Sequence, residues 1–342
     1  MKRVLVNNRV KGMALLLAAM VASGLSAGGA KDTGTVGGGA LDQAKVIRIG
    51  FQGSSLTRWL EDSQHFLEKE FGPDGIKIEF EQFSYGPPII EGLAAGSLDF
   101  GSVGDMPIVT AVANGLPIQS IYKDGIDPNS NTLLIPVNST IKSVAELKGK
   151  KVGASVGSSG HHYLVLVLAQ AGLTVDDVEI VNLGATDLGT ALATNQIAAG
   201  TTWEPYGTIF TVNGSAKYLA KSAGVKQNTS TEIARKAFIE ANPGITARYL
   251  KVQLQLADFV QADRPRAVRL IAEASGFKEA DLSTILVQEF DPHFTDFDWD
   301  QMTKTKQFLL DNDLINKDYD IRTLFTDKYL IEAEKLYAAS KK

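Results

Sequence analysis

The stretch KVGASVGSSGHHYLVLVLAQAG, residues 151–172, joins a strand pattern to a helix pattern through a loop of glycines and serines. Residues 151–154 alternate as in a strand, residues 161–170 have helical spacing, and Gly172 follows as the C-cap. The same order of strand, polar loop and helix recurs on both sides of this stretch. Such alternation predicts an α/β fold built from βα units around a largely parallel sheet.

Two runs of this pattern follow one another, and the second restarts at Thr132. After the second run, the amphipathic spacing is mainly helical to the end of the chain. We expect two α/β lobes with the second inserted into the first, so that two chain crossings form a hinge and the ligand cleft lies between the lobes. The expected ranges are 45–131 and 233–342 for the first, discontinuous lobe and 132–232 for the second. The return crossing is expected near residues 231–237. A single large doubly wound domain is the alternative.

Residues 1–30 have the features of a secretory signal peptide. Basic residues come first, at Lys2, Arg3, Arg9 and Lys11. An apolar run at 13–25 follows, which is too short to span a bilayer comfortably, and small residues at 28–30 offer a cleavage site. The Gly-rich segment 31–44 is expected to be a flexible linker. A retained membrane anchor is the alternative.

The chain contains no cysteine, which excludes disulfides, thiolate metal sites and a lipid anchor on cysteine. A signal peptide without a lipid anchor predicts a protein that is free in the periplasm. The net charge is −5, and removal of residues 1–30, with four basic and no acidic side chains, changes it to −9. An acidic protein of this kind is a poor partner for nucleic acid or an anionic membrane. No H-E-x-x-H or phosphate-loop motif occurs, so we predict no metal and no cofactor.

Ligands of open parallel sheets bind beyond the carboxyl ends of the strands, and polar loops follow several of the predicted strands. The candidate binding residues before Thr132 are Gln52, Ser54, Tyr85, Gly86, Pro87, Gly104, Asp105 and Met106. Those after it are Ser158, Ser159, His161, His162, Trp203 and Glu204. Helix capping by the serines and Asp105, a Gly-Pro turn and a core position for Trp203 are the alternative roles.

The loop at residues 157–162 (GSSGHH) is the most informative of these stretches. Its small residues let backbone N–H groups converge at a helix start, where the helix dipole favours negative charge, and serine and histidine side chains add donors. We therefore expect it to hold an anion whose tail lies against Trp203 and Tyr85. The Asp105 carboxylate would repel an anion, so Asp105 must present a backbone amide or bind a donor of the ligand. A capped helix with one buried and one exposed histidine is the alternative.

One motif argues for catalysis. Residues 153–157 match G-x-S-x-G between a strand and a helix, which is the setting of a nucleophile elbow with Ser155 as the nucleophile. A serine hydrolase also needs an acid and a histidine downstream, and His293 is the one histidine far downstream. Asp291 stands too close to His293 in sequence to supply both partners comfortably. Hydrolysis is therefore the weaker hypothesis.

At these residues the sequence resembles the binding proteins of the sulfonate, nitrate and taurine ABC importers, and the aliphatic sulfonate branch above all. The resemblance extends from Ile47 to about Leu330. Its motifs are IGFQ at 49–52, GPPIIEGLAAGSLDFG at 86–101, GDMP at 104–107, IKSVAELKGKKV at 141–152, GSSGH at 157–161 and WEPY at 203–206.

The resemblance implies a type II periplasmic-binding-protein fold and a monomeric, non-catalytic protein that captures a small organic anion. The ligand it implies is an aliphatic or aromatic sulfonate, with nitrate, taurine, a sulfate ester or a vitamin precursor as alternatives. It implies as partners a membrane permease with its cytoplasmic ATPase. It also implies that Gln52, Gly86, Asp105, Ser158, Ser159, His161 and Trp203 border the ligand.

The sequence departs from the family pattern at Gly200, where a bulky aromatic residue is usual shortly before the WEPY motif, and at His162. The departure at Gly200 leads us to expect a larger pocket and a larger ligand.

Overall fold

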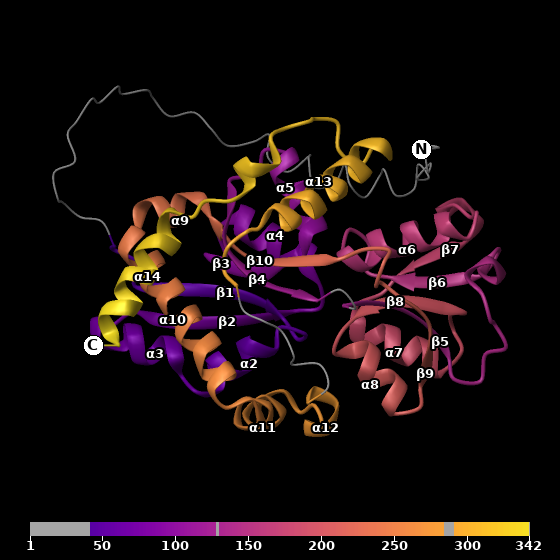
Figure 1. Cartoon of the computed structure of the whole chain (residues 1–342), viewed down its shortest axis with the longest axis horizontal. Coiled ribbons are helices and arrows are strands. Elements are labelled where there is room, and N and C mark those ends of the chain that lie inside the picture. Colours follow the sequence, from indigo (N-terminus) through magenta and orange to yellow (C-terminus); the bar gives the residue numbers. More distant parts are fainter. Residues whose placement is uncertain (1–41, 128–129, 284–290, 342) are drawn as a thin grey trace.

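The computed structural model describes residues 42–127, 130–283 and 291–341, which form two α/β lobes, each with its own five-stranded sheet (Figure 1). The predicted signal peptide, and the predicted linker up to residue 41, lie outside the described residues. The first sheet has the order β2 (Lys77–Phe83), β1 (Val46–Gln52), β3 (Phe100–Val103), β10 (Asn228–Arg235) and β4 (Ile118–Asp127). The second sheet has the order β7 (Glu179–Asn182), β6 (Lys151–Ala154), β8 (Ala199–Trp203), β5 (Asn131–Pro136) and β9 (Ala216–Lys221).

The chain leaves the first sheet after β4, builds the second sheet with β5 to β9, and returns as β10, which lies between β3 and β4 (Figure 1). The return strand begins at Asn228, before the crossing expected at 231–237. The predicted boundary at residue 232 therefore falls inside β10. That residues 45–131 with 233–342, and residues 132–232, are the limits of separate domains stays a prediction.

The sheets are mixed but largely parallel, as predicted, because four of the five strands in each sheet run in one direction. The strands β1, β2 and β3 are parallel, as are β6, β7 and β8, but β10 runs antiparallel to β3 and β4, and β5 runs antiparallel to β8 and β9. The antiparallel strands β5 and β10 are those that follow each passage between lobes. Hydrophobic periodicity reports which residues are buried and carries no information on strand direction.

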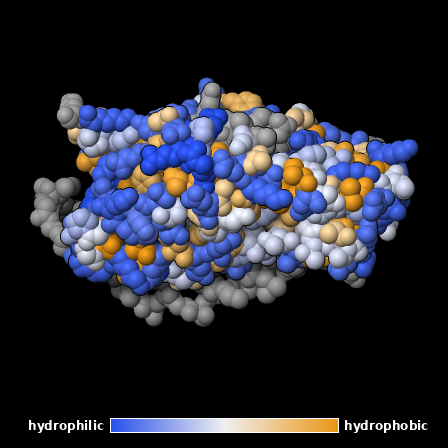
Figure 2. Space-filling model, turned by 90° about the horizontal axis from the view of Figure 1, so that it is seen from below, coloured by the Kyte–Doolittle hydropathy of each residue, from blue (hydrophilic) through white to orange (hydrophobic). Residues whose placement is uncertain are grey.

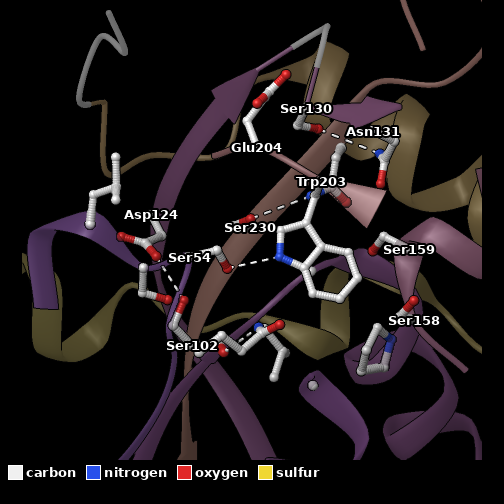
Figure 3. Close-up of a pocket in the computed structure, with 18 of the residues that line it drawn as sticks. Ser54, Ser102, Asp124, Ser130, Asn131, Ser158, Ser159, Trp203, Glu204 and Ser230 are labelled. Carbon is white, nitrogen blue, oxygen red and sulfur yellow. Dashed lines mark hydrogen bonds between the residues drawn. The ribbon is translucent and has the colours of Figure 1, made fainter. Parts of the chain in front are cut away.

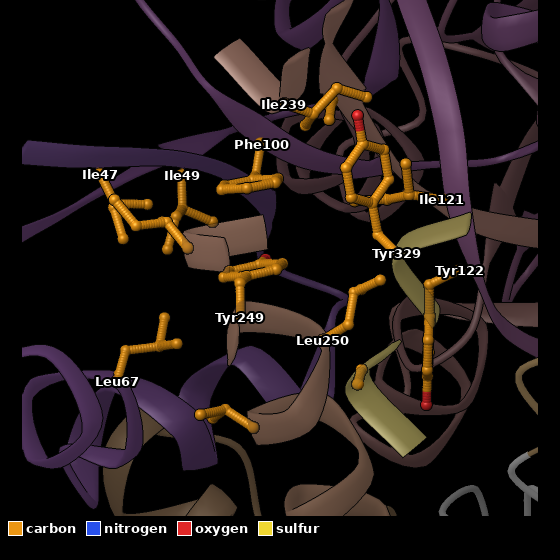
Figure 4. Packing of buried hydrophobic residues seen from close by; sticks show 14 of the residues in the cluster. Ile47, Ile49, Leu67, Phe100, Ile121, Tyr122, Ile239, Tyr249, Leu250 and Tyr329 are labelled. Carbon is orange, nitrogen blue, oxygen red and sulfur yellow. The ribbon is translucent and has the colours of Figure 1, made fainter. Parts of the chain in front are cut away.

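Helices cover both faces of the first sheet. Alternation in β1 buries Ile47 and Ile49 against a cluster in which the rings of Phe100 and Tyr249 stack 4.0 Å apart (Figure 4). This cluster joins the sheet to α3 (Phe66–Phe71), α10 (Pro243–Ala262) and α14 (Lys328–Ser340). A second cluster joins it to α4 (Gly86–Ala95), α5 (Asp105–Ala113) and α13 (Asp296–Asp311). The remaining elements of this lobe are α2 (Leu56–Ser63), η1 (Gly72–Asp74), α9 (Lys236–Ala241), α11 (Arg264–Ser275), α12 (Glu279–Leu282) and η4 (Ile321–Leu324).

The second sheet is covered in the same way. Its helical elements are η2 (Val144–Leu147), α6 (Ser159–Gln170), η3 (Val175–Asp177), α7 (Ala185–Ala193) and α8 (Tyr206–Val212). One cluster contains Leu164 and Leu168 of α6, and another contains Leu188 of α7 and Phe210 of α8. Gly200 of β8 and Gly153 of β6 are paired, and a Cβ on either would collide with Leu188, so these glycines let α7 approach the sheet closely.

The surface seen in Figure 2 is mainly hydrophilic, and its hydrophobic residues form small, separate groups. Scattered apolar residues of this kind are normal for a protein surface. In the part of the chain that the structure describes, none of the helices has the length and apolar character needed to cross a membrane.

Candidate functional site

A cavity of about 130 Å³ lies between the two lobes, where polar loops from both sheets meet. The predicted residues that line it are Gln52, Ser54, Gly86, Gly104, Ser158, Ser159, Trp203 and Glu204. The sequence therefore brings together residues separated by about half the chain, as the two-lobe interpretation expects. The volume is smaller than the roughly 300–1,000 Å³ of drug-sized sites, so this conformation suits a compact ligand.

The other predicted residues, Tyr85, Pro87, Asp105, Met106, His161 and His162, do not line the cavity. Tyr85 is the N-cap residue of α4 and Pro87 lies in its first turn, with its ring beside Gly157 of the other lobe. Met106 is buried in the cluster that packs α5 against the first sheet. These residues support the cavity wall.

Asp105 joins the two lobes behind the cavity. Its carboxylate accepts hydrogen bonds from Ser159 of α6 (2.6 Å) and Thr305 of α13 (2.6 Å), and it forms an ion pair with Lys226 (2.5 Å). Burial alone would raise the pKa of Asp105, but the Lys226 ammonium and the hydrogen bonds from Lys226 and Ser159 lower it to about 2. The Asp105 carboxylate is thus ionised, and its negative charge is balanced by Lys226. The repulsion of a bound anion that the sequence led us to expect is therefore removed.

The two histidines are buried in the second lobe. His161 accepts a hydrogen bond from the Gly157 amide at Nδ1, and the His162 ring stacks on Phe308 at 4.0 Å. Burial lowers the pKa of His161 to about 4 and that of His162 well below its usual range, so both are neutral at pH 7. Neither supplies positive charge to the cavity. The alternative of one buried and one exposed histidine is also wrong.

Four helix N-termini converge on the cavity. Residues that line it belong to the first turns or caps of α2, α4, α5 and α6. The amides of Leu56 and Thr57 in α2 and of Ser159 and Gly160 in α6 are first-turn groups, which an α-helix leaves without an intrahelical partner. Each N-terminus also carries about half a positive charge. The helix N-termini therefore supply partial positive charge to the cavity, whose lining contains no lysine or arginine.

Serine hydroxyls add further donors. Ser158 accepts from the His161 amide, Ser54 accepts from the Trp203 indole, and Ser130 accepts from Asn131. Because each oxygen accepts from a protein donor, its hydrogen can be donated to a ligand. Ser159 differs, because its hydroxyl donates to Asp105.

Trp203 spans the cavity. Its indole Nε1 donates to Ser54 Oγ of the other lobe at 2.8 Å, as Figure 3 shows. The ring also lies against Gly160, since a Cβ there would meet ring carbons at 3.4 Å and 3.5 Å. The side chain therefore offers an aromatic face to a ligand and links the lobes, and the core position weighed for it is wrong.

Further lining residues were not predicted: Leu56, Thr57, Ser102, Val103, Pro107, Asp124, Ser130, Asn131, Asn228 and Ser230. Some adjoin predicted residues at the starts of α2 and α5. Others lie on or beside β4, β5 and β10, where the chain passes between lobes. No sequence signal marks these strands as crossings, so their polar residues could not be assigned to the cleft.

Ser155 does not have the surroundings of a nucleophile. Its side chain is 2% exposed, it donates a hydrogen bond to the Leu183 carbonyl at 2.7 Å, and it does not line the cavity. His293 instead lies on the surface of the first lobe, paired with Glu334 at 2.9 Å. The geometry required of a Ser–His pair is therefore missing from the described residues.

Gly200 does not line the cavity, so the absence of a side chain there does not enlarge it. The glycine is buried in the second sheet, and a side chain there would meet Leu188 and Ile197 rather than a ligand.

A family model described as NMT1/THI5 like matches residues 71–267. A protein of Escherichia coli K12 that is assigned as an aliphatic sulfonates-binding protein is 31% identical over 232 residues, which cover 68% of this chain and 72% of that protein. The solved structure of the alkanesulfonate-binding protein SsuA from Xanthomonas axonopodis pv. citri, bound to MOPS, superposes with a TM-score of 0.72. Its sequence identity is 26%, and the match covers 83% of this chain and 97% of that one.

The desulfurization enzyme DSZB also shares the fold, with a TM-score of 0.63 at 15% identity over 86% of this chain and 99% of that one. At that identity the likeness concerns the fold alone. The solved structures share the overall fold of this chain. The chain therefore belongs to the NMT1/THI5-like family, within which it matches the aliphatic sulfonate-binding proteins.

Proposed function

We propose that this protein captures a small organic anion, of the sulfonate class, in the cavity between its lobes and delivers it to the permease of an ABC importer. The observation that carries the proposal is the convergence of four helix N-termini on a cavity with serine hydroxyl donors. Such a set of neutral donors suits a sulfonate, whose charge is spread over three oxygens and which needs no proton transfer to be bound.

Tight binding requires the hydrogen-bond donors, the Trp203 ring and lobe closure to act together. Three charge-assisted hydrogen bonds of about 1.5–3 kcal/mol each would contribute about 5–9 kcal/mol. Association costs an estimated ~4–15 kcal/mol, so the donors alone would bind weakly. Contact with the Trp203 ring and closure of the lobes through the Ser54 bond supply the rest.

The proposal also covers the cellular location of the protein and its partners. We infer that the chain is exported with a cleaved signal peptide, acts in the periplasm as a monomer, and meets a permease coupled to a cytoplasmic ATPase. A solved relative from Escherichia coli is a periplasmic aliphatic sulphonate binding protein, which supports the periplasmic location.

We also infer that the protein is not an enzyme. The buried, hydrogen-bonded Ser155 gives no support to hydrolysis, and the cavity contains no paired nucleophile and base among the described residues. The small cavity favours a compact ligand over a large aromatic one.

A thermal-shift screen of alkanesulfonates, nitrate and a sulfate ester, with an ester-cleavage assay alongside, tests this function. We expect concentration-dependent stabilisation by sulfonates and no cleavage. Stabilisation by nitrate alone would place the protein with another ligand of the family, and Ser155-dependent ester cleavage would contradict the proposal.

A further inference from the structure

Arg58 lies at the centre of a buried group of charges that the proposed function does not use. Its guanidinium donates hydrogen bonds to Glu61, which follows it in α2, and to Glu232 of β10. The Tyr249 hydroxyl of α10 donates to the other oxygen of Glu232 at 2.6 Å, and the Gln253 amide donates to the other oxygen of Glu61. All five side chains are buried, and we call them the Arg58 cluster.

The Arg58 cluster adjoins the cavity from two sides. Thr57, the residue before Arg58 in α2, lines the cavity. On the sheet, Glu232 is paired with Ser102 of β3, which also lines the cavity and donates to Asp124 at 2.7 Å (Figure 3). A charge held in the cavity therefore acts on the cluster.

Carboxylates outnumber cations in this region. One guanidinium serves both Glu61 and Glu232, and the Asp124 carboxylate at the cavity adds a third negative group. Lys123, the residue before Asp124, does not balance it, because its buried ammonium pairs with Asp298 of α13 at 3.1 Å. A further negative charge nearby would therefore meet repulsion unless a carboxylate gained a proton.

Glu232 is the member of the cluster suited to gain that proton. Burial raises its pKa to about 7; Arg58 opposes this effect and Asp124 adds to it. The Tyr249 hydroxyl can accept a hydrogen bond as well as donate one, so a protonated Glu232 would keep its partners. The other titratable groups that face it, Tyr122 of β4 and Tyr249, stay protonated because burial raises their pKa.

We propose that capture of the anion is coupled to the uptake of a proton by the Arg58 cluster, with Glu232 as the group that accepts it. The inference rests on the proposed function and adds a pH dependence to it. A bound anion brings negative charge close to Glu232 and so favours its protonated form. Affinity is therefore highest below pH 7, where Glu232 is already neutral, and falls as the pH rises through 7.

The histidines and Asp105 near the cavity do not respond at neutral pH. The pKa of Asp105 is about 2, that of His161 is about 4, and that of His162 is well below its usual range. A sulfonate is itself ionised throughout the neutral range. A proton taken up near pH 7 would therefore go neither to these three groups nor to the ligand.

Calorimetric titrations with propane-1-sulfonate, from about pH 5.5 to about pH 8.5, test the coupling. Bis-Tris and Tris buffers are suitable because they carry no anionic group that could occupy the cavity. Repulsion between charges about 10 Å apart changes an affinity by roughly 2- to 15-fold at effective dielectric constants between about 80 and about 20. We expect the affinity of the wild type to fall by this factor as the pH rises.

The proton itself can be counted by pH-stat titration in unbuffered solution at about pH 7.5. The same range of coupling predicts the uptake of about 0.15–0.6 proton per ligand bound.

Two variants assign the proton to its residue. Glu232→Gln keeps the shape of the side chain and removes its charge, so affinity should not change with pH and no proton should be taken up. Glu70→Gln is the matched control, because Glu70 also accepts from an arginine, Arg248 at 2.8 Å, but lies outside the cavity lining. It should retain the coupling of the wild type.

The wild type alone decides whether the coupling exists, even if Glu232→Gln does not fold. Constant affinity without proton uptake, or affinity that rises with pH, would refute the coupling and leave sulfonate capture standing. Undiminished proton uptake in a folded Glu232→Gln protein would refute the role of Glu232. Failure of the sulfonate to bind at any pH would overturn the proposed function, and this inference with it.

Discussion

Replacement of Gly104 by alanine tests how closely the lobes must meet. Gly104 is the N-cap residue of α5 and lines the cavity, and a Cβ there would overlap Ser159 Oγ of the other lobe and lie 3.2 Å from Asn228 Oδ1. Its φ of −73° suits any residue, so alanine introduces a steric effect and no backbone strain. Either the lobes stay apart or Ser159 leaves its place.

The cost follows from what Ser159 bonds to. Its hydroxyl donates to the buried, ionised carboxylate of Asp105 at 2.6 Å, and a hydrogen bond to a charged group contributes about 1.5–3 kcal/mol. Because this bond joins the two lobes, its loss weakens the closed form. We expect the dissociation constant for a sulfonate to rise by about 10- to 100-fold in Gly104→Ala, measured by calorimetry.

Two further variants make this result specific. Gly72→Ala is the control, because a Cβ there has no atom within 4 Å and the backbone is already helical. The double variant Gly104→Ala/Ser159→Ala removes the colliding oxygen, so its affinity should lie near that of Ser159→Ala alone. Wild-type affinity in Gly104→Ala, or fully additive losses in the double variant, would refute the reasoning.

Other predictions concern single contacts. Trp203→Phe removes the hydrogen bond to Ser54 but keeps an aromatic ring, so ligand affinity should fall by roughly 2- to 12-fold, the equivalent of about 0.5–1.5 kcal/mol. An unchanged affinity in calorimetry would show that this hydrogen bond does not contribute to binding. Ser158→Ala removes the cap of α6 and should lower the free energy of unfolding by about 1 kcal/mol in urea titrations, and an unaltered midpoint would count against capping. Lys226→Met leaves the buried Asp105 carboxylate without its cation and should destabilise the protein by about 3–5 kcal/mol, whereas a wild-type Tm would show that the pair is dispensable. The pKa of Glu232 is raised from 4.5 to about 7, so the native state binds the extra proton; this stabilisation is complete below pH 4.5 and is lost as the pH rises through 7, by at most about 3 kcal/mol. Glu232→Gln should lack that decline between pH 5 and 7.5, and an identical slope in both proteins would disprove the assignment.

Most of the fold could be predicted because it depends on local patterns. Alternation in β1 and the small-residue loop before α6 gave strand, helix and polar loop in the right order, and two such runs implied two lobes. The reversed direction of β5 and β10 could not be predicted, because these strands have the same buried pattern whichever way they run. It depends on contacts between distant segments.

The cavity residues at helix N-termini were predicted. Those on strands where the chain passes between the lobes were missed. Ser158 and Ser159 stand in a loop whose composition signals a helix N-terminus. The histidines were misplaced because the helix was expected to begin at His161, whereas it begins at Ser159. Two added residues place His161 and His162 inside the first turn with their side chains in the core. Asp124 lines the cavity but has no local signal, since its position there depends on where β4 meets β10.

The most direct measurement is a calorimetric titration of the protein with propane-1-sulfonate and with methyl propyl sulfone, which has a similar shape but no charge. If helix N-termini and serine hydroxyls hold a negative group, the sulfonate should bind at least about 10-fold more tightly, because the neutral sulfone forfeits charge-assisted hydrogen bonds. Equal affinity for the two compounds, or no binding of the sulfonate at all, would contradict the account.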